Sequence, residues 1–246
     1  MRPRHFKTFT IGLLLLAGCN QNPTASNEAE AKPAANAGAG AISGGWVENV
    51  TATADGGFRI GNPNAKVKLV EYASLTCSHC ADFAAKGVPA LKAQYIASGK
   101  VSLEIRNFVR DPIDVVGALL SRCGGAKPYA KLTEQMFANQ AAMFEKAQGM
   151  TQADQQRLST MTPAQQFQFL GQATGLTAFV AQRGIPAAKA NACLTDQKSL
   201  DQLVAMRNRA VNEYQLTGTP MFLINGKRVD DVAEWTALEP KIKAAL

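Results

Sequence analysis

Two cysteines separated by two residues, Cys77 and Cys80, lie where a strand-like segment gives way to a helix-like one. Residues 67–73 are rich in β-branched and aromatic types, which is typical of a β-strand. From Cys80 to Tyr95, apolar residues recur at helical spacing. Because this periodicity continues past Pro89, we expect the proline to kink the helix rather than end it. The C-x-x-C motif is therefore predicted at a strand–helix junction of an α/β fold.

The chemistry of this junction favours a reactive dithiol. The thiolate is the nucleophilic form of cysteine, and a free thiol with a pKa near ~8.5 is scarcely ionised at neutral pH. Unpaired N–H groups and the dipole at a helix N-terminus stabilise an anion. We therefore expect Cys77 to be the exposed nucleophile and Cys80, one turn into the helix, to be the buried resolving thiol. His79 can add a positive charge or a donor, and a more stable dithiol makes the disulfide a stronger oxidant.

Three other uses of the motif stay open. A zinc site needs two further ligands, and the sequence holds no second C-x-x-C. A structural disulfide between Cys77 and Cys80 would close too short a loop to restrain much of the unfolded chain. Copper could bind the two thiols and His79, because thiolates and imidazole suit Cu(I). Redox catalysis is the favoured interpretation, and it requires neither a metal nor a cofactor.

Two features elsewhere in the chain fit redox chemistry. Glu71 lies among core-type residues of the predicted strand, where a carboxylate costs energy unless it is paired or used. It is either a solvated residue at a strand edge or a buried acid with a raised pKa that exchanges a proton with Cys80. Pro220 precedes the predicted strand 221–224, where its missing N–H costs nothing. It is either a trans proline in a turn or a cis proline beside the disulfide, with Thr219 offering backbone groups to an extended peptide.

The remaining elements follow from periodicity and turn signals. Segments 46–53 and 58–60 are predicted as short strands around an Asp-Gly-Gly turn, and 101–109 as a further strand. Helices are expected at about 116–123, 129–140, 186–194, 200–214 and 236–246, with one more beginning at 162. A hairpin with an Asn-Gly turn covers 221–229. The order β-α-β, a block of helices, then β-β-α predicts one domain, 46–246, whose sheet is interrupted by a helical insertion at about 111–195.

The N-terminal residues carry targeting signals rather than fold. Residues 1–18 combine a basic start with an apolar run that is shorter than the roughly 20 residues needed to span a bilayer, which indicates a signal peptide. The run ends in Leu-Ala-Gly-Cys, which resembles the bacterial lipobox, so Cys19 is predicted to be lipidated; an ordinary cleaved signal is the alternative. Residues 19–45 have the composition of a flexible tether. We expect a lipid-anchored domain facing the periplasm of a bacterial cell envelope.

Charge and cysteine count narrow the possibilities. Without residues 1–18 the formal charge falls from +7 to +4, and the chain holds no Lys/Arg block of the kind that binds nucleic acid. If Cys19 carries lipid, four cysteines remain in a compartment where disulfides persist. Cys123 and Cys193 each end an apolar helical stripe, and as the remaining pair they are predicted to form a structural disulfide. Two buried free thiols are the alternative.

Taken together, these motifs resemble a known family. The segments EYASLTCSHC (71–80) and TGTPMFLINGK (217–227), the strand–C-x-x-C–helix unit and the helical insertion resemble the DsbA-like thiol:disulfide oxidoreductases of the thioredoxin superfamily. The resemblance covers about residues 58–246. It implies a thioredoxin fold with inserted helices, an exported location and disulfide transfer to substrate cysteines.

The resemblance also implies roles for individual residues. Cys77 is the attacking or attacked sulfur, Cys80 the resolving thiol, Glu71 the buried acid and Pro220 the cis-proline. Two positions depart from the best-known members. The dipeptide between the cysteines is Ser-His rather than Pro-His, and Thr219 rather than valine precedes the proline.

The sequence thus predicts an enzyme that oxidises substrate cysteines through its C-x-x-C disulfide. Reduction or isomerisation of disulfides is the alternative, because threonine before the proline also occurs in isomerase and reductase relatives. A copper- or peptide-binding module without turnover is a third hypothesis. The expected partners are unfolded or reduced exported proteins and a membrane redox protein that recycles the site. We expect a monomer.

Overall fold

The computed structural model describes residues 45–246 of the chain. The predicted signal peptide, Cys19 and nearly all of the predicted tether lie outside these residues. Within residues 45–246, no helix combines the length and the apolar character needed to cross a membrane.

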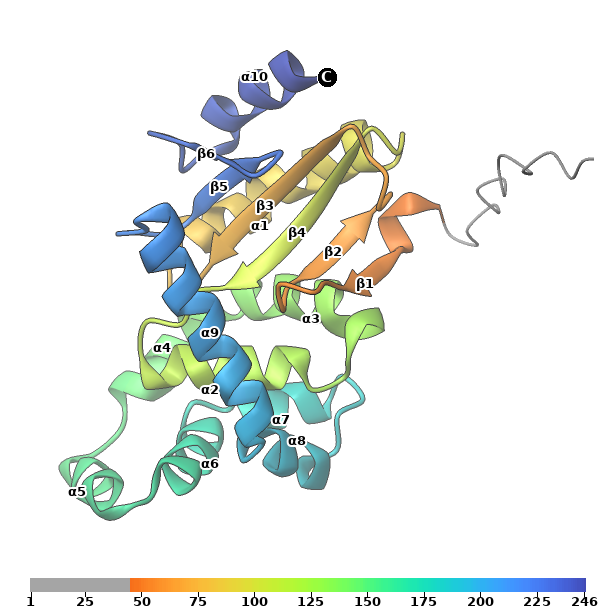
Figure 1. Cartoon of the computed structure of the whole chain (residues 1–246). Coiled ribbons are helices and arrows are strands. Elements are labelled where there is room, and N and C mark those ends of the chain that lie inside the picture. Colours follow the sequence, from red (N-terminus) through yellow and green to blue (C-terminus); the bar gives the residue numbers. More distant parts are fainter. Residues whose placement is uncertain (1–44) are drawn as a thin grey trace, which may run out of the picture. The chain divides into compact units, whose positions relative to one another are not determined.

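One mixed sheet lies at the centre of the described part of the chain, with the strand order β1-β2-β4-β3-β5-β6 (Figure 1). Its strands are β1 (Val50–Ala52), β2 (Phe58–Gly61), β3 (Val67–Ala73), β4 (Val101–Asn107), β5 (Met221–Ile224) and β6 (Lys227–Val229). The central strands β3 and β4 are parallel, and every other pair is antiparallel. Every residue of β4 is buried, and Lys68 is the one exposed residue of β3. A sheet buried on both faces explains why these two strands read as nearly continuous apolar runs.

Helices connect and cover the sheet. α1 (Ser78–Leu91) and the π-helical turn η2 (Lys92–Ile96) join β3 to β4, and α1 continues past Pro89. Between β4 and β5 lie α2 (Pro112–Arg122), α3 (Ala126–Ala138), α4 (Gln140–Gln148), α5 (Gln152–Thr160), α6 (Pro163–Ala173), α7 (Leu176–Ala181), α8 (Ala187–Leu194) and α9 (Gln197–Tyr214). α10 (Trp235–Ala245) follows β6. The order β-α-β, a block of helices, then β-β-α is the one expected from the sequence, but the sequence analysis predicted neither α5 nor α7.

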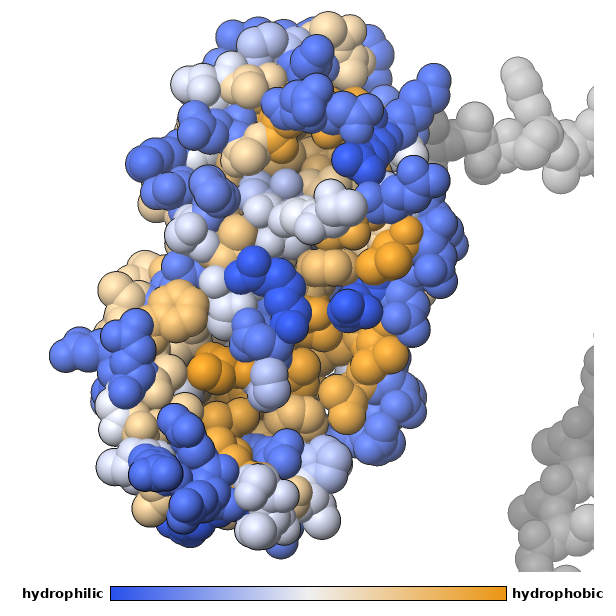
Figure 2. Space-filling view, turned by 90° about the vertical axis from the view of Figure 1, so that its left-hand side faces the viewer, coloured by the Kyte–Doolittle hydropathy of each residue, from blue (hydrophilic) through white to orange (hydrophobic). Residues whose placement is uncertain are grey.

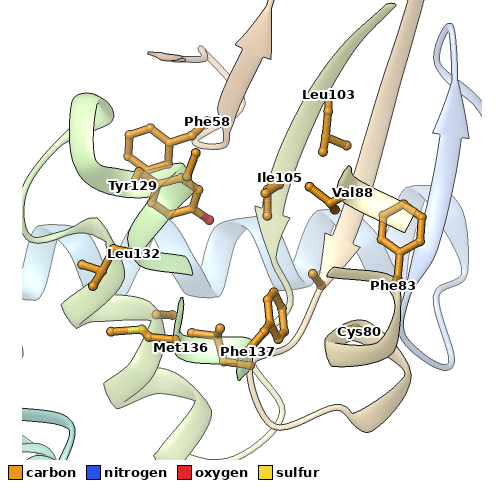
Figure 3. Close-up of a cluster of buried hydrophobic side chains, with 14 of the residues drawn as sticks. Phe58, Cys80, Phe83, Val88, Leu103, Ile105, Tyr129, Leu132, Met136 and Phe137 are labelled. Carbon is orange, nitrogen blue, oxygen red and sulfur yellow. The ribbon is translucent and has the colours of Figure 1, made fainter. Parts of the chain in front are cut away.

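Each face of the sheet carries its own hydrophobic core. α1 and α3 lie on one face, and α9 crosses the other (Figure 1). The larger core joins α1, α3 and the sheet, and in Figure 3 Cys80 lies within it, among side chains that include Phe83 and Phe137. The smaller core, under α9, includes Tyr72, Phe108 and Leu223. The alternation of β3 therefore directs Glu71 to the face that holds Cys80, and Tyr72 to the opposite face.

Three local expectations were wrong. Residues 46–48 form a 3₁₀ turn, η1 (Trp46–Glu48), rather than the start of a strand. The Glu48 N–H donates to the Gly45 carbonyl at 3.3 Å and the Asn49 N–H to the Trp46 carbonyl at 3.1 Å, so the chain closes a turn there instead of extending. The predicted strand 101–109 ends at Asn107. The predicted helix 129–140 divides at Asn139 into α3 and α4.

A disulfide joins two of the helices in the insertion. Cys123, which caps the C-terminus of α2, bonds to Cys193 in α8 across 70 residues, with an S–S distance of 2.00 Å. The bond ties α8 to α2, whose residues Val116, Leu119 and Leu120 are buried in the main core.

Candidate active site

The reactive pair lies where the fold was expected to place it. Cys77 is the N-cap of α1, and Cys80 lies in the first turn with no exposed surface. Hydrogen bonding by the Cys80 thiol, by Thr219 and by the backbone N–H groups of Cys80 and His79 lowers the pKa of Cys77 to about 4, although burial opposes the shift. Burial, and next the hydrogen bond with Cys77, raises the pKa of Cys80. One sulfur is thus held as a thiolate and the other as a thiol.

Cys77 is more covered than the sequence predicted. It is 5% exposed, because the segment carrying Thr219 and Pro220 lies against it. In its thiol form Cys77 donates a hydrogen bond to the carbonyl of Thr219 at 3.1 Å. The peptide bond between Thr219 and Pro220 is cis. While Cys77 is a thiol, the buried hydroxyl of Thr219 has no hydrogen-bond partner among residues 45–246; it is this hydroxyl, and not the carbonyl, that can donate to the Cys77 thiolate.

Glu71 is buried rather than solvated. It is 2% exposed, and its Oε1 has no hydrogen-bond partner in the part of the chain that the structure describes. Burial, and then the negative charge of Cys77, raise the pKa of Glu71 to about 8. Glu71 in turn contributes to the raised pKa of Cys80. A protonated acid close to Cys80 can supply a proton when that sulfur leaves as a thiolate.

His79 was expected to stabilise the Cys77 thiolate through its side chain, and in the structure it does so through its backbone N–H. The residue is exposed, and its contribution to the thiolate comes from its backbone N–H rather than from its ring. The side chain lines a cavity of about 160 Å³ that also borders Phe83 and Trp235. His79 therefore faces outward, where it can contact a bound molecule. Across residues 45–246, no group of three or more His, Cys, Asp or Glu side chains could hold a metal ion.

Two residues that sequence reasoning missed hold the loop in front of the dithiol. The first is Asp114, which is 1% exposed and accepts hydrogen bonds from the Ser74 hydroxyl at 2.6 Å, the Leu75 N–H at 2.8 Å and the Arg110 N–H at 3.1 Å. Its burial raises its pKa to about 7. Its neighbour Asp111 caps α2 and accepts a hydrogen bond from the Thr76 hydroxyl.

The second residue is Gln140, the first residue of α4. Its Nε2 donates hydrogen bonds to the carbonyls of Leu75 at 2.9 Å and of Cys77 at 3.0 Å. A carboxylate beside an apolar helix stripe was an available signal for Asp114. No sequence signal identifies Gln140, because its role depends on where α4 meets a loop more than sixty residues earlier.

A groove runs beside the cis-proline. It has a volume of about 290 Å³ and is lined by residues of the two segments 216–221 and 228–233, which include Pro220 and Met221. Ala233 lines both this groove and the cavity beside His79, so the two are adjacent. Figure 2 shows a side of the molecule on which hydrophobic residues gather in patches between polar ones. Such surfaces suit apolar polypeptide segments.

Fold and site together define a class of protein. A sheet covered by helices, a dithiol at the N-terminus of the first long helix, and a cis-proline against the outer sulfur form a thioredoxin-type redox site. The comparisons agree with this class. A family model described as thioredoxin matches residues 53–244.

Known structures and sequences add to this result. The crystal structure of a protein-disulfide isomerase from Novosphingobium aromaticivorans is 33% identical, with a TM-score of 0.72, and the match covers 76% of this chain and 95% of that one. The α-DsbA1 protein of Wolbachia pipientis has the same fold, with 24% identity, a TM-score of 0.61, and coverage of 76% and 89%. Proteins from Rickettsia bellii and Rickettsia felis, whose names provisionally describe a protein-disulfide oxidoreductase, are 26% and 29% identical over 70% of this chain.

The chain spans 58% and 54% of the length of these two Rickettsia proteins. It belongs to the thioredoxin family, and the relatives named above include a protein-disulfide isomerase and two proteins provisionally named as protein-disulfide oxidoreductases. The predicted fold class, a thioredoxin fold interrupted by a helical insertion, is confirmed.

Proposed function

We propose that the protein oxidises pairs of cysteines in other polypeptides, by transferring the disulfide formed between Cys77 and Cys80. The observation that carries the proposal is the asymmetry of the pair: the pKa of Cys77 is lowered to about 4, whereas that of Cys80 is raised. A thiolate stabilised in the dithiol form favours that form and makes the disulfide a strong oxidant. Cys77 is also the better leaving group.

In the proposed reaction the disulfide is transferred in two thiol–disulfide exchange steps. A substrate thiolate attacks the Cys77 sulfur, which forms a mixed disulfide and breaks the Cys77–Cys80 bond. Cys80 leaves with the electron pair and takes a proton, for which the buried carboxyl of Glu71 is the nearby donor. The second substrate thiolate then attacks the substrate sulfur of the mixed disulfide and releases Cys77 as a thiolate. The substrate loses two electrons and two protons, and the Cys77–Cys80 pair gains two electrons.

The surroundings of Cys77 support a polypeptide substrate. The carbonyl of Thr219 and the groove beside Pro220 offer an extended peptide a backbone acceptor and room for its side chains next to the reacting sulfur. In this proposal the substrates are unfolded or reduced exported proteins. A membrane redox protein then reoxidises Cys77 and Cys80.

The location is part of the proposal. Lipidation of Cys19 would anchor the domain 46–246 to a membrane, with residues 19–45 as its tether and with the site facing the periplasm. A disulfide between Cys123 and Cys193 fits an oxidising compartment. The site is complete within one chain, which is consistent with the proposed monomer.

A trapping experiment tests the proposal. The oxidised protein is mixed with a reduced, unfolded polypeptide whose native form has one disulfide. Formation of that disulfide is followed by mass spectrometry. We expect substrate oxidation by the wild type. When a Cys80→Ala variant is activated at Cys77 with a small disulfide reagent and mixed with a form of the substrate that keeps only one cysteine, we expect a stable mixed disulfide through Cys77, because no second thiol is present to release it. Cys77→Ala is the matched control and should neither oxidise the substrate nor trap it. An active Cys77→Ala variant would refute the assignment.

Isomerisation is a second candidate, favoured by one observation. The relative from Novosphingobium aromaticivorans that is 33% identical is named a protein-disulfide isomerase. In that reaction the Cys77 thiolate attacks an incorrect disulfide of the substrate and is later released, with no net change in oxidation state. The reduced protein should then rescue a scrambled substrate faster than the oxidised protein oxidises a reduced one, which the same assay measures.

A further inference from the structure

Gln140 reaches from the helical insertion to the backbone that carries the nucleophile. It is 8% exposed, and its single amide nitrogen donates to two carbonyls, those of Leu75 and Cys77, at 2.9 and 3.0 Å. These carbonyls flank Thr76, so one side chain fixes both ends of the last turn before α1. None of the redox steps described above uses Gln140 as a donor, acceptor or charge.

The Cys77 carbonyl has a second hydrogen-bond partner, which links the orientation of this carbonyl to the start of α1. It accepts the hydrogen bond from the Ala81 N–H at 3.1 Å that closes the first turn of α1. On the other side, the Cys77 N–H donates to the Ser74 carbonyl at 3.1 Å. Hydrogen bonds therefore fix the Cys77 backbone on both sides of its Cα. The bond from Gln140 is the one whose donor lies outside both the loop and α1.

The orientation of this backbone controls the reactivity of the sulfur. The thiolate is stabilised in part by the backbone N–H groups of His79 and Cys80. Hydrogen bonds weaken steeply as distance and angle depart from their preferred values. If the Cys77 peptide rotated, its sulfur would move relative to those N–H groups and lose part of their stabilisation.

We propose that Gln140 is a positioning residue for Cys77: by holding the carbonyls of Leu75 and Cys77 it aims the sulfur at the N–H groups that open α1, and so keeps the thiolate stable. This inference rests on the proposed function, because it names what tunes the same reactive thiol. It assigns a role in the reaction to the helical insertion, which otherwise lies outside the redox pair.

The test is a titration of the Cys77 thiolate by its ultraviolet absorbance in the full-length reduced protein. Gln140→Leu removes both hydrogen bonds and introduces no charge. We expect the pKa of Cys77 to rise by about one unit, a tenfold change in its acid dissociation constant. Oxidation of substrate should slow in parallel, because a Cys77 of higher pKa is a poorer leaving group when the mixed disulfide is resolved.

The matched control is Gln166→Leu. Gln166 lies in α6 of the same insertion, is partly buried, and also donates from Nε2 to two backbone carbonyls, those of Leu158 and Met161, at 2.9 and 3.3 Å. This variant loses an equivalent pair of hydrogen bonds away from the site. We expect it to leave the pKa of Cys77 unchanged.

An unchanged Cys77 pKa in folded Gln140→Leu, or an equal shift in Gln166→Leu, would overturn the inference. If Gln140→Leu does not fold, Gln140→Asn serves instead: its shorter side chain cannot span both carbonyls, and an unchanged pKa there overturns the inference equally. The titration needs no substrate. A wild type without disulfide-exchange activity therefore counts against the proposed function, whereas an active wild type with an unmoved pKa in the variants counts against Gln140 alone.

Discussion

Replacing Glu71 with glutamine removes a carboxyl group that the fold buries without a partner for its Oε1. Its pKa is about 8 in the folded protein, against 4.5 for an ordinary glutamate, and burial is the larger cause. The folded state therefore keeps a proton that the unfolded state has lost. The stability that this group contributes is complete below the unfolded pKa and is lost as the pH rises through the folded pKa.

The magnitude follows from the size of the shift. Stability changes by about 1.4 kcal/mol per pH unit for each proton held by one state and not by the other. Between about pH 5 and pH 8 the wild type should therefore lose about 3 kcal/mol relative to Glu71→Gln. A buried glutamine adds a constant cost that displaces the curve without changing its slope.

Urea unfolding at several pH values measures this difference. The oxidised protein is the right form, because its Cys77 and Cys80 are joined and do not titrate. It lacks the negative charge of Cys77, so burial alone raises the pKa of Glu71 there and about 3 kcal/mol is the upper value of the loss. Glu145→Gln, at an exposed position of α4, controls for the substitution itself. If the wild-type and Glu71→Gln curves run parallel from pH 5 to pH 8, Glu71 is not a buried acid with a raised pKa, and its role as a proton donor fails with it.

Three further predictions concern stability. Replacing Cys123 and Cys193 with alanine should cost roughly 4 kcal/mol by the chain-entropy model for a loop of 70 residues, measured as a lower urea midpoint; an unchanged midpoint would show that the bond restrains nothing. Arg106→Leu should lower the free energy of unfolding by about 3–5 kcal/mol, because it leaves the buried carboxylate of Glu104 without its 2.6 Å ion pair. Thermal unfolding measures the change, and a variant with the same midpoint as the wild type would contradict this prediction. Gly57→Ala should destabilise by about 1–3 kcal/mol in the same assay, since its Cβ would stand 2.6 Å from the Glu104 carboxylate; a neutral result would mean that the carboxylate moves aside freely.

Much of the fold could be predicted because its signals are local. The strand before Cys77, the helix after it and the capping box at Thr162 all lie within a few residues of the elements they specify. α5 shows the limit of this approach. It has no buried residue and therefore no apolar stripe, and the capping box between Thr151 and Asp154 was the signal that would have found it.

The site was predictable where its chemistry depends on neighbours in the chain. The pairing of Cys77 with Cys80 follows from their spacing, whereas the 5% exposure of Cys77 depends on a segment that lies 142 residues later. The contacts of Asp114 and Gln140 with the loop before Cys77 likewise depend on how α2 and α4 pack. Such contacts require the three-dimensional structure, because no periodicity or spacing encodes them.

The reduction potential of the Cys77–Cys80 pair tests most directly whether a stabilised Cys77 thiolate makes this site an oxidant. It can be measured by equilibrating the protein with glutathione buffers and counting thiols by mass spectrometry. We predict a value of about −120 mV, as expected when the dithiol form is stabilised. A value of about −270 mV, which is typical of a thioredoxin reductant, would contradict the oxidase assignment.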